Sequence, residues 1–254
     1  MQNNRHRVQI YLLKIPFIFF ILFTITLFIT TACSTNQTLN EKWSSQIERR
    51  LQEVNTVQGK LDITMGHVTL KQELWVQRPD FLRTETELGP NQFMGTIVVL
   101  NETDGWVYSP FLKLVTVVDR VQMNGADDTA APTEIDSQRA GSQLERMPEQ
   151  IAQLIQSDVQ INEVGTETVA NRKTTHLAMI VSEDSPVSST VSDGGFPPGA
   201  LHVWLDNRYA YPLAVRDSNG RHIRFTDVQF NYAIDPITFT FVPPPGVPVR
   251  RVEP

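Results

Sequence analysis

The sequence predicts an α+β fold, in which one antiparallel, β-rich domain carries a few helices. After Gly59, apolar and polar residues alternate with a period of two along much of the chain, which is typical of strands with one buried face. Gly, Asn and Asp residues separate these segments at short intervals, as in a meander of hairpins. Apolar residues with helical spacing occur in two further segments. These three observations predict the fold class.

The N-terminus has the layout of an export signal. The first fourteen residues contain Arg5, Arg7 and Lys14 and no acidic residue, and a strongly apolar stretch covers residues 15–29. The apolar stretch leads, after three small residues, to Cys33, the only cysteine among 254 residues. We therefore expect a lipoprotein signal peptide whose cysteine receives a diacylglyceryl group.

This interpretation divides the chain into three parts. Residues 1–32 are the signal peptide, residues 33–40 a lipidated tether, and residues 41–254 one folded domain. Thr30 departs from the Leu usual in a lipobox, and two alternatives stay open: an uncleaved membrane anchor, or an ordinary secretory signal with an incidental cysteine. Both alternatives leave the domain on the far side of the membrane, because the basic flank is N-terminal.

The charge of the exported part argues against nucleic-acid partners. Removing residues 1–32 lowers Lys+Arg from 22 to 19 against 28 Asp+Glu, so the net charge moves from −6 to −9. Nucleic acids and anionic lipid surfaces attract clustered Lys and Arg, so membrane contact is expected to come from the lipid anchor. With one cysteine there is no internal disulfide, and a hydrophobic core must stabilise the domain.

The elements follow in order from local patterns. Trp43, Ile47, Leu51 and Val54 recur at helical spacing and predict one amphipathic helix. A second, short helix is predicted to open at Pro148, with apolar residues on one face. Strands are predicted over residues 60–65, 68–76, 81–88, 93–100, 111–118, 159–164, 174–181, 201–206, 211–216, 221–232 and 237–242. Turns are expected at Gly66, at 89–91, 103–105 and 218–220, and prolines 243–245 are expected to end the sheet at its edge.

Two of these strands, at 93–100 and 111–118, are apolar on both faces. Each face must therefore be covered or must line a cavity. A polar stretch at 124–141 precedes the short helix, which is either a mobile lid or a helix docked permanently on the sheet. A second polar stretch at 182–199 predicts a long exposed loop.

No recognised catalytic or metal-binding motif occurs in the chain. There is no glycine-rich phosphate loop, nucleophile elbow, paired-His zinc helix or cysteine cluster. His67, His176, His202 and His222 lie in separate strands or turns without ligand-like spacing. We therefore predict neither a catalytic residue, nor a metal site, nor a cofactor.

Two segments resemble a known family. Residues 73–83 (ELWVQRPDFLR) place an aromatic residue, a basic residue and Pro before Phe, and residues 101–110 (NETDGWVYSP) contain Gly, Trp, Tyr and Pro. This pattern is similar to the bacterial LolA/LolB superfamily of outer-membrane lipoprotein carriers and receptors. Weaker similarity covers residues 164–172 and 239–246, so the order agrees over most of residues 41–246.

The resemblance implies a curved antiparallel sheet, an open half-barrel, with helices covering its concave apolar face. It implies that Arg78 hydrogen-bonds the lid helix in a closed state and releases it on binding, with Pro79 fixing the adjacent turn; the alternative for Arg78 is an ordinary surface charge. Several apolar residues become candidates for the cavity wall or for structural packing: Trp75, Phe81, Phe93, Ile97, Val99, Trp106, Tyr108 and Leu114.

The implied function is a membrane-anchored, extracytoplasmic protein that binds acyl chains of lipids or lipoproteins, for their transport or sorting, at the cell membrane or the outer membrane. An alternative is an envelope-stress-sensing or regulatory module that binds another envelope protein. A third is a hydrolase whose site is assembled from distant residues. The lipid anchor, which the soluble carrier lacks, favours a receptor, sensor or lipid-binding relative.

Overall fold

The computed structural model describes residues 39–87, 95–119, 144, 146–157, 159–183 and 196–252. The predicted signal peptide, Cys33 and the stretch at 124–141 lie outside the described residues, as does Phe93. The predicted tether is described only at residues 39 and 40, which belong to the first helix instead. Among the described residues, no helix has the length and apolar character needed to cross a membrane.

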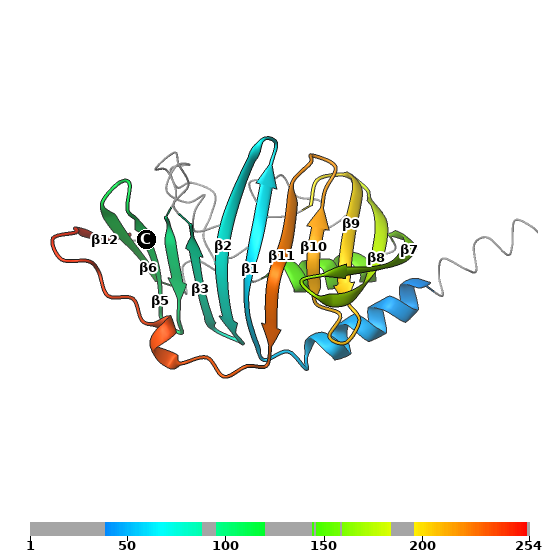
Figure 1. Cartoon of the computed structure of the whole chain (residues 1–254), viewed down its shortest axis with the longest axis horizontal. Helices are drawn as coiled ribbons and strands as arrows, with labels where there is room; N and C mark the ends of the chain where they lie inside the picture. Colours follow the sequence, from blue (N-terminus) through cyan, green and yellow to red (C-terminus); the bar gives the residue numbers. More distant parts are fainter. Residues whose placement is uncertain are drawn as a thin grey trace, which may run out of the picture.

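Twelve strands form one curved, open sheet (Figure 1) in the order β12-β6-β5-β4-β3-β2-β1-β11-β10-β9-β8-β7. All paired neighbours are antiparallel except β12 and β6, which are parallel. The strands are β1 Thr56–Met65, β2 Val68–Gln77, β3 Phe81–Thr86, β4 Ile97–Leu100, β5 Asp104–Ser109, β6 Leu114–Asp119, β7 Gln160–Val169, β8 Arg172–Val181, β9 Gly199–Asp206, β10 Pro212–Arg216, β11 His222–Phe230 and β12 Val249–Arg251. The predicted α+β class with an open, mostly antiparallel half-barrel is confirmed.

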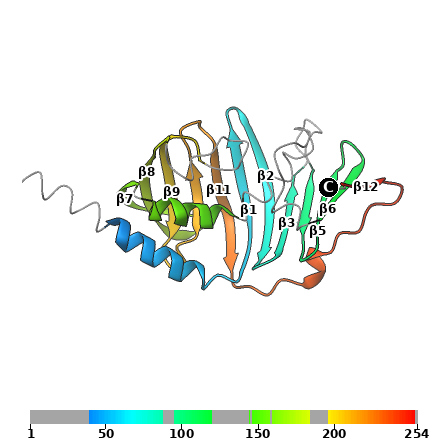
Figure 2. The same cartoon turned by 180° about the vertical axis from the view of Figure 1, so that it is seen from behind.

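Two helices pack on this sheet and share one core with it. The first covers residues 39–51, and Trp43, Ile47 and Leu51 are buried as their spacing predicted. The second covers residues 146–156 and buries Ile151 and Leu154. In Figure 2 it crosses the strands from β8 to β11. It begins before Pro148, because residue 146 is already helical.

Gly59 lies inside β1, although the sequence suggested that the strand begins after it. A Cβ atom at Gly59 would lie 2.5 Å from the carbonyl oxygen of Asp227 and 3.0 Å from the Phe225 ring. The register between β1 and β11 shifts just beyond Gly59, between Lys60 and Leu61. Glycine is therefore required by close approach of the strands and not by a turn.

We expect Gly59→Ala to lower the free energy of unfolding by about 1–3 kcal/mol, because a backbone carbonyl must move to admit the methyl group. Urea unfolding followed by circular dichroism measures the loss. Gly165→Ala is the matched control, because a Cβ there meets nothing within 4 Å. Equal stability of the two variants would contradict the close approach.

The turn predicted at 103–105 lies instead at residues 101–104, and the strand that follows it was not predicted. Asn101 Oδ1 accepts hydrogen bonds from the backbone N–H groups of Thr103 and Asp104, which closes the turn before β5 begins at Asp104. The next turn contains Phe111 and Leu112, both exposed, so β6 starts at Leu114 and not at residue 111. Because the Asn101 side chain accepts these hydrogen bonds, the turn forms earlier in the chain than the position of Gly105 suggested.

The predicted last strand at 237–242 is also wrong. Residues Pro236–Phe239 form the 3-10 helix η2, where the Asp235 side chain accepts a hydrogen bond from the N–H of Ile237. Its Phe239 side chain is buried, so the alternating pattern reflects packing against a sheet face and not pairing at an edge. The prolines precede the true last strand, β12, which pairs with β6.

Strands β7 and β8 are longer than predicted and form one hairpin. Ala170 and Asn171 connect them with φ angles of 49° and 59°, as a tight two-residue hairpin turn requires. Besides pairing with β8, strand β7 contacts β11. Arg224 on β11 donates a hydrogen bond to the Thr168 carbonyl oxygen of β7 at 3.4 Å. The hairpin thus curls back toward β11, and Figure 1 shows it crossing this end of the sheet.

Candidate functional site

The two faces of the sheet differ in what covers them. We call the face that shares the core with the two helices the helix-side face; it includes Leu74, Val76, Leu82, Val98 and Val107. On the opposite face of β3 to β5, residues 238–241 contact Phe81, Arg83, Trp106 and Tyr108, and we call this face the C-terminal face. Successive residues of a strand alternate between the two, so register assigns every residue to a face.

Most of the predicted cavity residues lie on the C-terminal face. Trp75 pairs through Arg83 and Val99 with Trp106 in one row across the strands, and Ile97 pairs with Tyr108. Each of these residues is adjacent in the sequence to a residue whose side chain lies on the helix-side face. The Trp106 and Tyr108 rings lie 5.8 Å and 6.0 Å from the ring of Phe241 in the C-terminal segment.

The remaining candidates divide between the faces. Phe81 lies on the C-terminal face, with its ring centroid 5.3 Å from that of Phe239. Leu114 pairs with Ser109 and therefore shares the helix-side face with Val107. The sequence identified the doubly apolar strands, but it could not show which face meets the helices, because both faces are apolar.

The helix-side face is apolar but includes a few buried polar groups. Leu74, Thr84, Val98, Val107 and Thr116 form one row across five strands. Both threonines of the row are buried, and so is Gln72 on the same face of β2. Among the described residues, Thr84 Oγ1 and Gln72 Oε1 have no hydrogen-bond partner. Buried polar atoms without partners are uncommon, and they are available to a bound polar group or to water.

Arg78 connects the sheet to both helices. It follows β2 directly, and its backbone N–H donates to the Asn55 carbonyl oxygen at 2.9 Å. Its Nη1 donates to the Leu51 carbonyl oxygen, at the end of the first helix, at 3.0 Å. Its Nη2 pairs with Glu149 Oε1 on the second helix. One guanidinium group thus contacts both helices, and the adjacent turn contains Pro79 after a cis peptide bond.

Glu149 is the acidic partner in this junction. Burial raises the pKa of its carboxyl group, and the neighbouring Arg78 guanidinium opposes that rise. Its side chain remains 48% exposed, so water screens much of the ion pair. The junction therefore contributes geometry more than energy, because it holds the ends of two helices at one point of the sheet.

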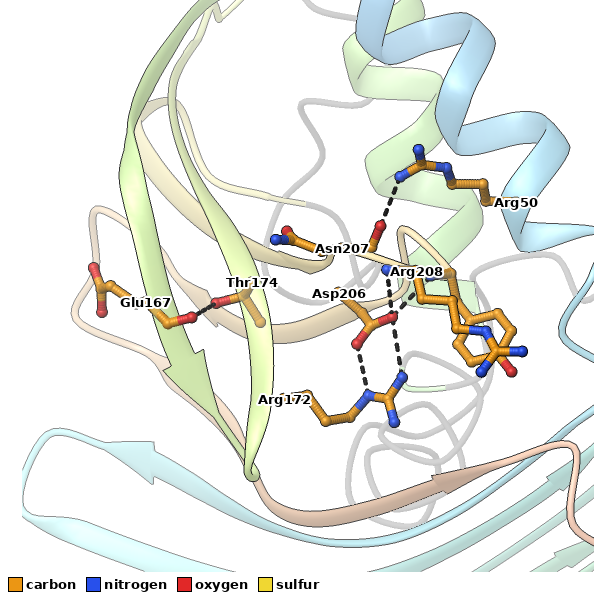
Figure 3. A network of polar contacts seen from close by, with 8 residues as sticks. Arg50, Glu167, Arg172, Thr174, Asp206, Asn207 and Arg208 are labelled. Carbon is orange, nitrogen blue, oxygen red and sulfur yellow. Dashed lines mark hydrogen bonds and ion pairs between the residues drawn. The ribbon is translucent and has the colours of Figure 1, made fainter.

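A second polar network lies where β8 begins and β9 turns into β10 (Figure 3). Arg172 Nε donates to Asp206 Oδ2 at 2.6 Å, and Asp206 Oδ1 accepts from the N–H groups of Arg208 and Tyr209. Arg50 of the first helix donates to the Asn207 carbonyl oxygen at 2.9 Å. The network fixes the turn and connects it to the first helix.

The structure also brings together histidines that the sequence left apart. His176 Nε2 lies 2.9 Å from His202 Nδ1, and the His222 ring lies 6.3 Å from the ring of Trp204, which stacks on His176. The signal available in the sequence was that these residues occupy alternate positions on their strands. Which strands pair with one another cannot be read from a single sequence. In the described part of the chain, no group of three or more His, Cys, Asp or Glu side chains is arranged to hold a metal ion.

No family model matches the chain, and no curated protein does. Solved structures match the chain. An uncharacterized conserved protein from Thermus thermophilus is 12% identical, with a TM-score of 0.49 over 82% of this chain and 98% of that one. The lipoprotein LppX of Mycobacterium tuberculosis is 12% identical, with a TM-score of 0.48 over 78% of this chain and 98% of LppX.

The Pseudomonas aeruginosa MucA/MucB complex contains a third similar chain. It is 16% identical, with a TM-score of 0.45, and the match covers 78% of this chain and 61% of that one. These comparisons describe similar chain paths and assign no activity to this chain.

Proposed function

We propose that this chain is a membrane-anchored, extracytoplasmic protein that binds acyl chains of lipids or lipoproteins between its curved sheet and the helices. Lipidated Cys33 is the proposed anchor, at the cell membrane or the outer membrane. Transport or sorting of the bound molecule needs only a shielded apolar surface and an opening, so the proposal requires no catalytic group and no cofactor.

The apolar helix-side face supports this proposal. Each methylene group transferred from water to an apolar surface contributes about 0.8 kcal/mol, so a long acyl chain binds without directed polar contacts. The unpartnered Thr84 and Gln72 oxygens on the same face offer a place for the polar end of such a molecule. Leu114 stays in the proposed wall, whereas the residues of the C-terminal face are assigned to packing under residues 238–241.

Arg78 is the observation that carries the proposal. A side chain that joins both helices to one point of the sheet can hold them closed, and its release frees both at once. We therefore propose that the helix over residues 146–156 is a lid and that Arg78 is its gate. The alternative, a helix docked permanently, assigns Arg78 to stability alone.

We expect Arg78→Gln to free the lid, because glutamine cannot reach both helices and carries no charge for Glu149. The half-exposed ion pair with Glu149 contributes at most about 1 kcal/mol, so amides of the second helix should exchange up to about fivefold faster. Hydrogen exchange read by mass spectrometry measures this. Arg50→Gln is the matched control, because Arg50 also donates to a backbone carbonyl oxygen but contacts the β9–β10 turn.

Binding is tested on the full chain, extracted gently in mild detergent from its own cells. Native mass spectrometry followed by organic extraction should find acylated molecules on the natural chain and fewer of them on Arg78→Gln. A well-folded chain without acylated molecules would contradict the proposal. It would direct attention to co-purified envelope proteins, as the regulatory alternative expects.

A further inference from the structure

Three histidines and one tryptophan form a cluster where β7 curls toward β11. Trp204 on β9 pairs with His176 on β8, and Arg216 on β10 pairs with both His202 and His222. The rings of His176 and Trp204 stack at 4.2 Å with an angle of 15° between their planes. Trp204 and His176 are both buried, which is unusual for ionisable and amphipathic side chains at one end of a sheet.

The contact between His176 and His202 depends on protonation. The two ring nitrogens lie 2.9 Å apart, so one must donate a proton and the other must accept it. The second nitrogen of His176, Nδ1, lies 3.1 Å from Glu167 Oε1 on β7, in ion-pair contact but without hydrogen-bond geometry. If both rings were fully protonated, each facing nitrogen would carry a hydrogen and the bond would be lost.

The surroundings of the cluster oppose that second proton. The Arg216 guanidinium lies 5.9 Å from the centre of the Trp204 ring. Burial lowers the pKa of His202, with Arg216 and His176 adding to the effect. Burial also lowers the pKa of His222, and Arg224 and Arg216 act in the same direction. The fold therefore favours the neutral forms of His202 and His222.

Every strand around the cluster contributes a polar or charged group. Glu167 is the acid that contacts a histidine of the cluster in the described structure, and Asp62 lies opposite Arg224 in the β1–β11 register. The groups that face the cluster are Glu167 and the Thr168 carbonyl of β7, Trp204 of β9, Arg216 of β10, Arg224 of β11, and Asp62 and Thr64 of β1. The charged groups among them are two arginines, Arg216 and Arg224, and two acids, Glu167 and Asp62.

We propose that His176, His202 and His222 are a proton-sensitive clasp that holds the β7–β8 hairpin against β9, β10 and β11 when neutral and releases it in acid. The hairpin carries Val169, which belongs to the same core as the helices. Release of the hairpin would therefore withdraw Val169 from the apolar core. This device stands independently of what the core binds.

The direction of the pH effect follows from the lowered pKa values. A histidine whose pKa is lower in the folded state stabilises the fold above its ordinary pKa of 6.5 and loses that contribution as the pH falls below it. Acidification should therefore loosen the hairpin, because protonated His202 and His222 would lie beside Arg216 and Arg224.

The experiment is hydrogen exchange of the full chain in mild detergent at pH about 7.5 and about 5.5, corrected for the intrinsic exchange rate. For the natural chain, we expect amides of β7 and β8 to exchange about tenfold faster at the lower pH. In the double variant His202→Asn, His222→Gln, neutral amides replace both rings, and the acid-induced acceleration should fall below about twofold. His67→Gln, at the exposed β1–β2 turn, is the matched control and should keep the full acceleration.

Two outcomes overturn the proposal: no acceleration in the natural chain, or the same acceleration in the double variant. If circular dichroism shows that the double variant does not fold at neutral pH, the natural chain supplies the test by itself. An NMR titration should then give His202 and His222 midpoints below the ordinary histidine value of 6.5, with β7 amide shifts following the same midpoints. Amide shifts that follow a different midpoint would also refute the clasp.

Discussion

Asp206→Ala is expected to lower the free energy of unfolding by about 3–5 kcal/mol, because it leaves Arg172 without its buried partner. The carboxylate is 2% exposed, and it accepts hydrogen bonds from two backbone N–H groups of the following turn as well as from Arg172. The guanidinium also lies 4.9 Å from the Phe230 ring centre and 5.6 Å from that of Tyr209. Removing the acid therefore disturbs the turn and the aromatic packing together.

Urea unfolding at neutral pH measures this loss, and two further variants separate its parts. Asp206→Asn keeps an acceptor for the turn and should lose less than Asp206→Ala. Asp227→Ala, at an exposed position on β11, is the control and should stay within about 0.5 kcal/mol of the natural chain. Equal stability of the natural chain and Asp206→Ala would mean that the network in Figure 3 is dispensable.

Leu154→Ala is expected to cost about 2–5 kcal/mol, because Leu154 is fully buried between the second helix and the sheet. Truncation removes apolar contacts and leaves a cavity that the helix and the strands can close only in part. Chemical unfolding gives the size of the loss, and hydrogen exchange shows where it is felt. Ile180→Ala is the control, since 56% of Ile180 is exposed on β8.

The two measurements also separate a lid from a permanent helix. A lid held by Leu154 should open locally, so the amides of residues 146–156 should exchange faster than those of β9 and β10 in the variant. Uniform acceleration through the sheet would mean that the helix unfolds only with the whole domain. That result would not affect the description of the apolar core, but it would rule out a lid in the proposed function.

The elements were predictable where local chemistry decides them. Ile47 and Leu51 are buried because helical spacing places them on one face, and Gly66 and Ser218-Asn219-Gly220 lie in hairpin turns as expected. Two errors arose where a side chain outside the pattern controls the backbone. Asn101 closes a turn before the glycine of β5, and Asp235 caps a 3-10 helix where alternation suggested a strand.

The candidate site was less predictable. Arg78 was singled out by resemblance, and it does contact both helices; whether it releases them stays a prediction. The proposed wall residues, such as Val99 and Trp106, lie on the face under the C-terminal segment. A shift of one residue exchanges the faces of a strand, and a strand that is apolar on both faces carries no signal that tells the two faces apart.

The sequence alone determined the α+β class, the two amphipathic helices and most of the hairpins, because each depends on residues close together in the chain. Tertiary structure decided which face meets the helices and how Arg78 reaches Leu51 and Glu149. It also decided that His176 meets His202, 26 residues away in the chain. Such contacts depend on strand order and register, which arise from burial across the whole sheet and leave no local pattern in the sequence.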